Sequence, residues 1–161
     1  MMQSSQQKIP MMQWRRLYLT IISAKLHLSE SAIYVKVSVS ELKGQTQRTP
    51  VAKDGDQSDG TEFSWNFPMK FEIKEEILTG SDLDRVPFLD LKLKSPGRIR
   101  SRGVGLVKAP LRRFLLDNVS AYTSDEQEVE IQINDYSGHH AGILKFSYRF
   151  EPPFTNRPRM S

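Results

Sequence analysis

The stretch FSWNFPMKFEI, residues 63–73, places an apolar side chain at every second position. A period of two is the repeat of a β-strand, whose successive side chains point to opposite faces of a sheet. Pro68 interrupts the run, and because proline cannot donate a ladder hydrogen bond we expect an edge strand or a bulge there. The residues that share the apolar face are Phe63, Trp65, Phe67, Met69, Phe71 and Ile73. The stretch therefore predicts a strand with one face in an apolar core.

The same alternation recurs along the chain, for example in AIYVKVSVS, residues 32–40. PLRRFLLDN differs, because it opens with proline and then has apolar residues at helical spacing, which predicts one short helix near residues 110–117. The expected strands cover residues 16–23, 32–40, 46–53, 63–73, 87–95, 103–109, 128–135 and 142–150. Short strands at regular intervals with turn residues between them predict an all-β fold, an eight-stranded antiparallel β-sandwich.

Length and composition favour one domain that works inside the cell. The chain has 161 residues, a formal net charge of +4 and no cysteine. We expect the domain to span residues 14–150, between a flexible segment 1–13 and a flexible Pro-rich tail 151–161. The absence of cysteine excludes disulfides, thiolate nucleophiles and cysteine metal sites. No apolar run approaches the ~20 residues that a membrane span needs, and we expect a cytoplasmic location.

One stretch is much more basic than the rest. KSPGRIRSRGVGLVKAPLRR, residues 94–113, carries seven basic side chains and no acidic one. Gly97, Gly103 and Gly105 disfavour a helix there, so the charge is expected on a loop and a strand.

Several stretches together resemble a C2 domain: LYLTIISAK, IYVKVSV, QRTPVAKDG with FSWNFPMKFEI, GVGLVKAPLRRFLL, and GILKFSYRF. The chain is most similar to the small single-domain plant C2 proteins of the stress- and cold-responsive type and of the Bonzai-associated type. The resemblance covers residues 14–150 and implies a C2-type sandwich with three loops gathered at one end. Those loops would be residues 25–31, 53–61 and 95–102.

Calcium-binding members of that family hold the ion with Asp side chains on the first and third loops, because Ca²⁺ takes six to eight oxygen ligands. The matching positions here are Leu26 or His27, Ala32, Pro96, Ser101 and Gly103, with Arg98, Arg100 and Arg102 interleaved in the third loop. Arginine repels the cation and supplies no oxygen. The calcium-ligand aspartates are therefore expected to be missing, with no metal and no cofactor.

Guanidinium groups pair with phosphate oxygens, so the same loop can meet anionic phospholipid directly. We expect Arg98, Arg100 and Arg102 to contact headgroups, with Ile99 entering the interface. Alternation turns Lys36, Lys92 and Lys94 outward, and they would form a second basic surface if their strands are neighbours. The resemblance implies a recognition module peripheral to the plasma membrane, in stress, defence or cell-death signalling.

Other interpretations remain open. The acidic second loop could neutralise the arginines through Asp54, Asp56, Asp59 and Glu62. Three of these residues, Asp54, Asp56 and Asp59, could instead bind calcium weakly. The module could also be an adaptor for an unidentified protein partner that has lost lipid binding. Changing the three loop arginines to Ser would separate these cases. Lipid binding should fall sharply, whereas the binding of a protein partner at a sheet edge should not change. The sequence contains no organised catalytic nucleophile, so we do not expect an enzyme. It also has no aromatic side chains interleaved with the arginines, so we do not expect nucleic-acid binding.

Overall fold

A computed structural model gives the structure of this chain, and it describes residues 12–27, 30–40, 45–53, 61–79, 87–97, 99–120 and 126–155. The predicted all-β fold is confirmed, and so is the short helix, which spans Leu111–Ser120. In chain order the elements are β1 (Gln13–Leu26), β2 (Ala32–Val39), β3 (Thr46–Arg48), β4 (Ala52–Lys53), β5 (Glu62–Lys74), α1 (Glu75–Thr79), β6 (Phe88–Ser95), β7 (Arg102–Pro110), α2 (Leu111–Ser120), β8 (Gln127–Asn134), β9 (His140–Phe150) and β10 (Phe154–Thr155).

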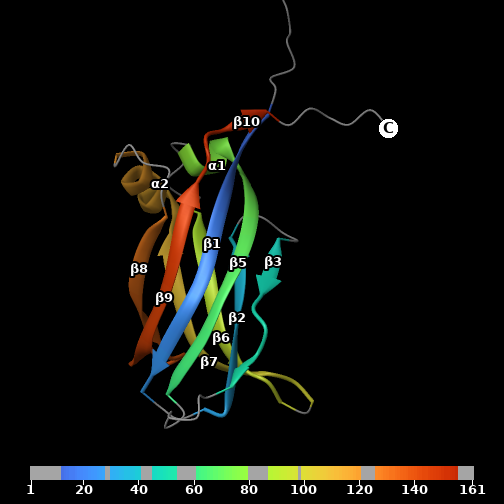
Figure 1. Cartoon of the computed structure of the whole chain (residues 1–161), viewed down its shortest axis with the longest axis vertical. Helices are drawn as coiled ribbons and strands as arrows, with labels where there is room; N and C mark the ends of the chain where they lie inside the picture. Colours follow the sequence, from blue (N-terminus) through green and yellow to red (C-terminus); the bar gives the residue numbers. More distant parts are fainter. Residues whose placement is uncertain are drawn as a thin grey trace, which may run out of the picture.

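The strands form one continuous antiparallel sheet that folds over into two layers (Figure 1). One layer has the order β5-β1-β9-β8, and the other has the order β7-β6-β2-β3, with β4 also on β2. β7 and β8 join the layers through a single residue pair, Leu106 with Asn134. Because β3 and β4 are two segments of one edge strand, and β10 is a two-residue addition, eight principal strands remain, as predicted.

A buried threonine bridges the break between β3 and β4. Thr49 is 2% exposed, and its backbone N–H donates to the carbonyl of Val35 at 2.9 Å. Its Oγ1 accepts a hydrogen bond from the backbone N–H of Val35, also at 2.9 Å. The hydroxyl thus satisfies a buried N–H of β2 at a point where the next residue, Pro50, has no N–H of its own.

β5 lies at the edge of its layer, in agreement with the expectation from Pro68, and pairs with β1. A bulge near Asn66 shifts the register of this pair, and Asn66 adopts a left-handed φ of 49°. The outer backbone of β5 is partly capped by side chains from the other layer: the amide of Gln47 donates to the carbonyl of Lys70 at 2.6 Å, and that of Gln45 to Glu72 at 2.8 Å. These bonds close one open side of the sandwich.

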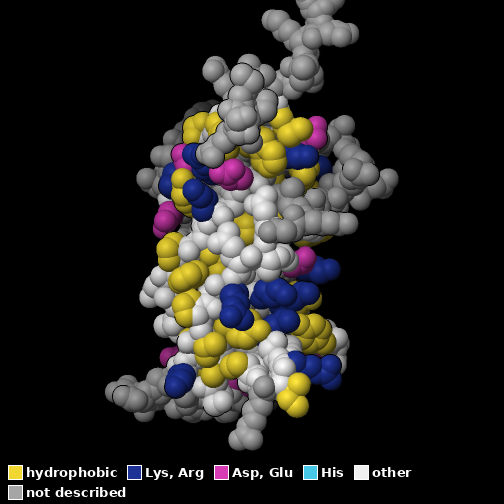
Figure 2. Space-filling view, turned by 90° about the vertical axis from the view of Figure 1, so that its right-hand side faces the viewer, with side chains coloured by type: hydrophobic (Ala, Val, Ile, Leu, Met, Phe, Trp, Pro, Cys, Tyr) yellow, Lys and Arg dark blue, Asp and Glu magenta, His cyan; other side chains and the backbone are white. Residues whose placement is uncertain are grey.

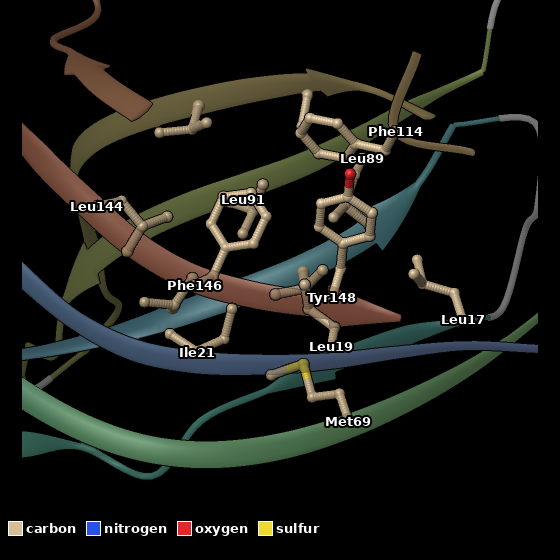
Figure 3. Close-up of a cluster of buried hydrophobic side chains, with 14 of the residues drawn as sticks. Leu17, Leu19, Ile21, Met69, Leu89, Leu91, Phe114, Leu144, Phe146 and Tyr148 are labelled. Carbon is tan, nitrogen blue, oxygen red and sulfur yellow. The ribbon is translucent and has the colours of Figure 1, made fainter. Parts of the chain in front are cut away.

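The core fills the space between the layers (Figure 3). Leu17, Leu19 and Ile21 of β1 are buried together with Phe146 and Tyr148 of β9. Helix α2 covers one end of this core, since the ring of Phe114 stacks on that of Tyr148 with centroids 4.6 Å apart. The apolar face of residues 63–73 is mostly buried as predicted, while Trp65 and Phe67 are half-buried near the edge.

Paired backbone extends slightly beyond residues 14–150 on both sides. β1 begins at Gln13, and β10 pairs with it through Gln13–Thr155 and Trp14–Phe154. Residues 1–11 and 156–161 lie outside the described residues, so the flexibility expected for the rest of the two terminal segments stays a prediction.

Candidate functional site

Cross-strand pairing brings three cations into one row on the outer face of the β7-β6-β2-β3 layer. Lys36 of β2 lies directly opposite Arg48 of β3 on one side and Lys92 of β6 on the other. Arg48 and Lys92 are exposed and Lys36 is half-buried. Like charges directly opposite one another destabilise a sheet. No ion pair joins any of the three to a carboxylate within the described ranges.

Lys94 lies two residues after Lys92 on the same outer face of β6, opposite Tyr34 of β2. Tyr34 faces outward by alternation but is only 7% exposed, and the guanidinium carbon of Arg48 lies 5.5 Å from its ring centroid. Beside them is a cleft of about 440 Å³. Its lining comes from β2, from the edge strand and from the loop after β6, and includes Tyr34, Arg48, Pro50, Pro96 and Ser101. We call Arg48, Lys36, Lys92 and Lys94 the basic face; Figure 2 shows Lys and Arg side chains gathered in the lower half of the molecule, on the side of the β3 edge.

The described strand ends that flank the three expected loops lie at one end of the sandwich, which we call the loop end (Figure 1). The register pairs that flank them are Lys25 with Glu62, Ala32 with Lys53, and Ser95 with Arg102. The turn between β8 and β9, residues 135–139, also lies at this end, and the rings of His27 and His140 meet there with centroids 4.4 Å apart.

The third loop presents an apolar tip beside a cation. Ile99 is 97% exposed and Arg100 is exposed as well. The loop turns tightly at Gly97, where any Cβ would collide with the backbone carbonyl of Arg100. Arg98, the other predicted cation of this tip, lies outside the described residues.

Arg102 differs from Arg100 because it has an acidic partner. Its Nη2 donates to Oε1 of Glu30 at 2.6 Å, and the two side chains are 64% and 11% exposed. The ion pair ties the third loop to the first across 72 positions of sequence. Neutralisation of the loop arginines was expected from the second loop, whose Asp54, Asp56 and Asp59 lie outside the described residues. The fourth expected acid, Glu62, pairs with Lys25 at 3.7 Å.

Sequence reasoning missed two of these residues. Arg48 lies in a predicted strand, and because its neighbour Thr49 points inward, Arg48 could have been assigned to the outer face. Only the pairing of β3 with β2 brings it beside Lys36. Glu30 sits in a loop without periodicity, so no local pattern indicated its role. Within the described ranges, no group of three or more His, Cys, Asp or Glu side chains could hold a metal ion.

This two-layer arrangement is the fold of a C2 domain. The first C2 domain of plant Extended Synaptotagmin 1 superposes with a TM-score of 0.63 at 14% identity, covering 88% of this chain and 96% of that one. The two tandem C2 domains of Extended-Synaptotagmin 2 give a TM-score of 0.59 at 16% identity, covering 89% of this chain and 42% of that one. At such identities the likeness shows the fold alone.

In sequence, the chain is similar to Protein SRC2 of soybean (Glycine max), with 36% identity over 146 residues. The match covers 86% of this chain and 47% of the soybean protein, so the chain spans about half the length of that relative. No protein-family model matches the chain. Among the described residues, no helix has the length and apolar character that crossing a membrane requires.

Proposed function

We propose that this protein is a non-enzymatic recognition module that binds anionic phospholipid at a membrane surface without calcium. C2 domains in general bind membranes and phospholipids and are non-catalytic. The observation that carries the proposal is the basic face, where Arg48, Lys36, Lys92 and Lys94 lie side by side without acidic partners in the described structure. An arrangement that weakens the sheet is best explained by an anionic ligand.

The electrostatic attraction expected from the basic face is strong enough for reversible membrane binding. Attraction to an anionic leaflet is worth about 1 kcal/mol for each Lys or Arg near the surface. The four cations of the basic face together supply about 4 kcal/mol, or roughly a thousandfold in affinity. Ile99 would add apolar contact at the tip, and Arg100 would add one more charge.

The Glu30–Arg102 pair supports independence from calcium. In the calcium-binding proteins that this chain resembles, the ion lies between the first and third loops. Here the guanidinium of Arg102 pairs with the carboxylate of Glu30 and so joins the same two loops. A permanent side-chain cation therefore takes the place of the calcium ion in linking them. We therefore assign Arg102 to bracing the loop end, and Arg100 to direct contact with lipid.

By extension from the resemblance, we propose that the module works in the cytoplasm at the plasma membrane, in stress or defence signalling. The soybean relative is about twice as long as the matched region, so this role is a proposal about the chain in hand and not a transfer from that protein.

Co-sedimentation with liposomes tests the proposal. Neutral and anionic vesicles are compared in calcium and in chelator, at low and high salt. We expect binding to anionic vesicles alone, equal in both buffers and weakened by salt. The triple variant Lys36→Gln, Lys92→Gln, Lys94→Gln should bind about a hundredfold more weakly.

A matched control changes the same number of charges on the other layer. Lys70, Lys74 and Arg149 lie on β5 and β9, and their conversion to Gln alters the net charge equally. This control should retain most of the affinity. Equal losses in the two triple variants, or binding that appears only with calcium, would contradict the proposal.

The second candidate function is an adaptor for a protein partner, favoured by the edge of β8 that faces β7, which is mostly unpaired in the part of the chain that the structure describes. Within the described residues β8 pairs with β9 along its length but meets β7 only at Asn134. Its outer face carries Glu128, which pairs with Lys145 at 3.1 Å, and Glu130, an exposed acid that would suit an extended basic segment added to the sheet. Binding of such a partner should survive the Lys36, Lys92 and Lys94 triple variant.

A further inference from the structure

The turn between β8 and β9 is a rigid projection at the loop end. The carboxylate Oδ1 of Asp135 accepts hydrogen bonds from the backbone N–H groups of Ser137 and His139, each at 2.9 Å. Gly138 adopts a φ of 87°, and its N–H donates to the carbonyl of Asp135 at 2.9 Å. These bonds satisfy the Asp135 carboxylate locally and hold the turn in one conformation.

Tyr136 projects from this turn, and it is 60% exposed. Its ring lies over Gly103 of β7: a Cβ at Gly103 would lie 2.5 Å from Cε2 of the tyrosine and 2.7 Å from its hydroxyl. The ring can therefore occupy this place only because residue 103 has no side chain.

The position of Gly103 places Tyr136 beside the basic face. Gly103 is the cross-strand partner of Lys94, directly after a register shift that leaves Val104 without a partner on β6. Residues directly opposite in a sheet direct their side chains to the same face. Lys94 also lies opposite Tyr34 on its other side. The order across the layer is thus Tyr34, Lys94, Tyr136, with the cation between two tyrosines.

This position suits a membrane interface. A tyrosine has an apolar ring and a polar hydroxyl, and such side chains are enriched at the level of lipid headgroups. Tyr136 also lies at the same end of the sandwich as Ile99, so the two exposed residues can meet one surface together. A ring that served only to pack on Gly103 would not need to remain 60% exposed.

We propose that the β8–β9 turn is a fourth membrane-contacting loop and that Tyr136 is its anchor in the headgroup layer. The inference rests on the proposed function, because it presumes that the basic face and the loop end approach an anionic bilayer. It adds a contact that none of the three loops expected from the sequence supplies.

Single-cysteine labelling can test membrane contact of the third loop and of the β8–β9 turn separately, because the natural chain contains no cysteine. Ile99→Cys, Tyr136→Cys and Leu116→Cys are each labelled with an environment-sensitive fluorophore. Leu116 is a matched exposed apolar residue, 66% accessible, on α2 at the opposite end. With saturating anionic vesicles we expect a blue shift and increased emission at positions 99 and 136, and no change at 116.

A response at position 99 without one at 136 would overturn the fourth-loop inference and leave membrane binding intact. Absence of any response, with no sedimentation of the unmodified chain, would overturn the proposed function and this inference with it. A response at 116 alone would assign membrane contact to the opposite end and overturn both.

Substitution gives an independent test that does not depend on a label. Tyr136→Ala should weaken binding to anionic vesicles about fivefold, whereas Tyr136→Trp should bind at least as tightly as the natural chain. Leu116→Ala is the control and should bind normally. Thermal unfolding of each variant verifies the fold. Unchanged affinity in a folded Tyr136→Ala variant would refute the anchor.

Discussion

The pairing of Arg102 with Glu30 leads to a prediction in which a double variant behaves like the natural protein. The pair has no net charge, so at a distance it neither attracts nor repels an anionic membrane. Glu30→Gln adds one positive charge to the loop end, Arg102→Gln removes one, and the double variant restores the balance.

The magnitudes follow from the charge near the surface. One unit charge is worth about 1 kcal/mol, so Glu30→Gln should tighten binding to anionic vesicles about fivefold and Arg102→Gln should weaken it about fivefold. The double variant should lie within about twofold of the natural chain. Arg100→Gln, with no acidic partner among the described residues, should weaken binding whether or not Glu30 is changed.

Stability changes should accompany these effects, because Glu30 is only 11% exposed. Arg102→Gln leaves that carboxylate without its cation, and we expect a loss of about 1 kcal/mol of unfolding free energy, since the guanidinium side of the pair is largely exposed. Urea unfolding measures this loss, and it should be partly recovered in the double variant.

Liposome titration of the four proteins at fixed ionic strength is the assay. If Arg102 holds a lipid phosphate directly, the double variant loses that fork of hydrogen bonds and should bind at least about tenfold more weakly than the natural chain. That result, or an unchanged affinity of Glu30→Gln, would refute the bracing role of Arg102.

Three further predictions concern stability. Thr49→Val removes the hydroxyl that the buried N–H of Val35 requires, so urea unfolding should show a loss of about 1–3 kcal/mol; a loss below ~0.5 kcal/mol would mean that another group satisfies this N–H. Burial raises the pKa of Tyr148 to about 12, from about 10 in an unfolded chain. The stability contributed by the neutral phenol is therefore complete below pH ~10 and lost as the pH rises towards 12. The urea midpoint of unfolding should fall over this pH range, and it should fall less steeply in Tyr148→Phe. The same pH dependence of the midpoint in both proteins would count against the raised pKa of Tyr148. Asn66 has a left-handed backbone that Gly also adopts and Val does not, so thermal unfolding should show Asn66→Gly close to the natural chain and Asn66→Val weaker by about 1–2 kcal/mol; equal stability of the two would argue against the left-handed conformation.

Local periodicity predicted most of the strands and their faces, although the strand expected at residues 46–53 is broken into β3 and β4 and the outward-facing Tyr34 is buried. The alternation in residues 32–40 placed Ile33, Val35 and Val37 inside and Lys36 outside, and each of those assignments agrees with the burial observed. The short helix followed in the same way from Pro110 and the apolar spacing after it. A strand or helix has a fixed repeat, so a few neighbouring residues carry the information about which side is buried.

The composition of the candidate site was decided by contacts between distant residues. That Lys36 and Lys92 are neighbours depends on the pairing of β2 with β6, and the addition of Arg48 depends on the pairing of β2 with β3. The strand alternation could mark each cation as outward, but it could not say which cations share a row, because register is set by non-local packing and turn geometry.

The sequence by itself thus determined an all-β sandwich of the C2 type, an apolar core and a concentration of basic residues near the third loop. Only the tertiary structure decided that Arg102 is paired with Glu30 and that Tyr136 lies over Gly103. The reason is physical: a period of two or 3.6 is a property of the local backbone, whereas an ion pair or a ring over a glycine exists only after distant segments have been brought together by the packing of the core.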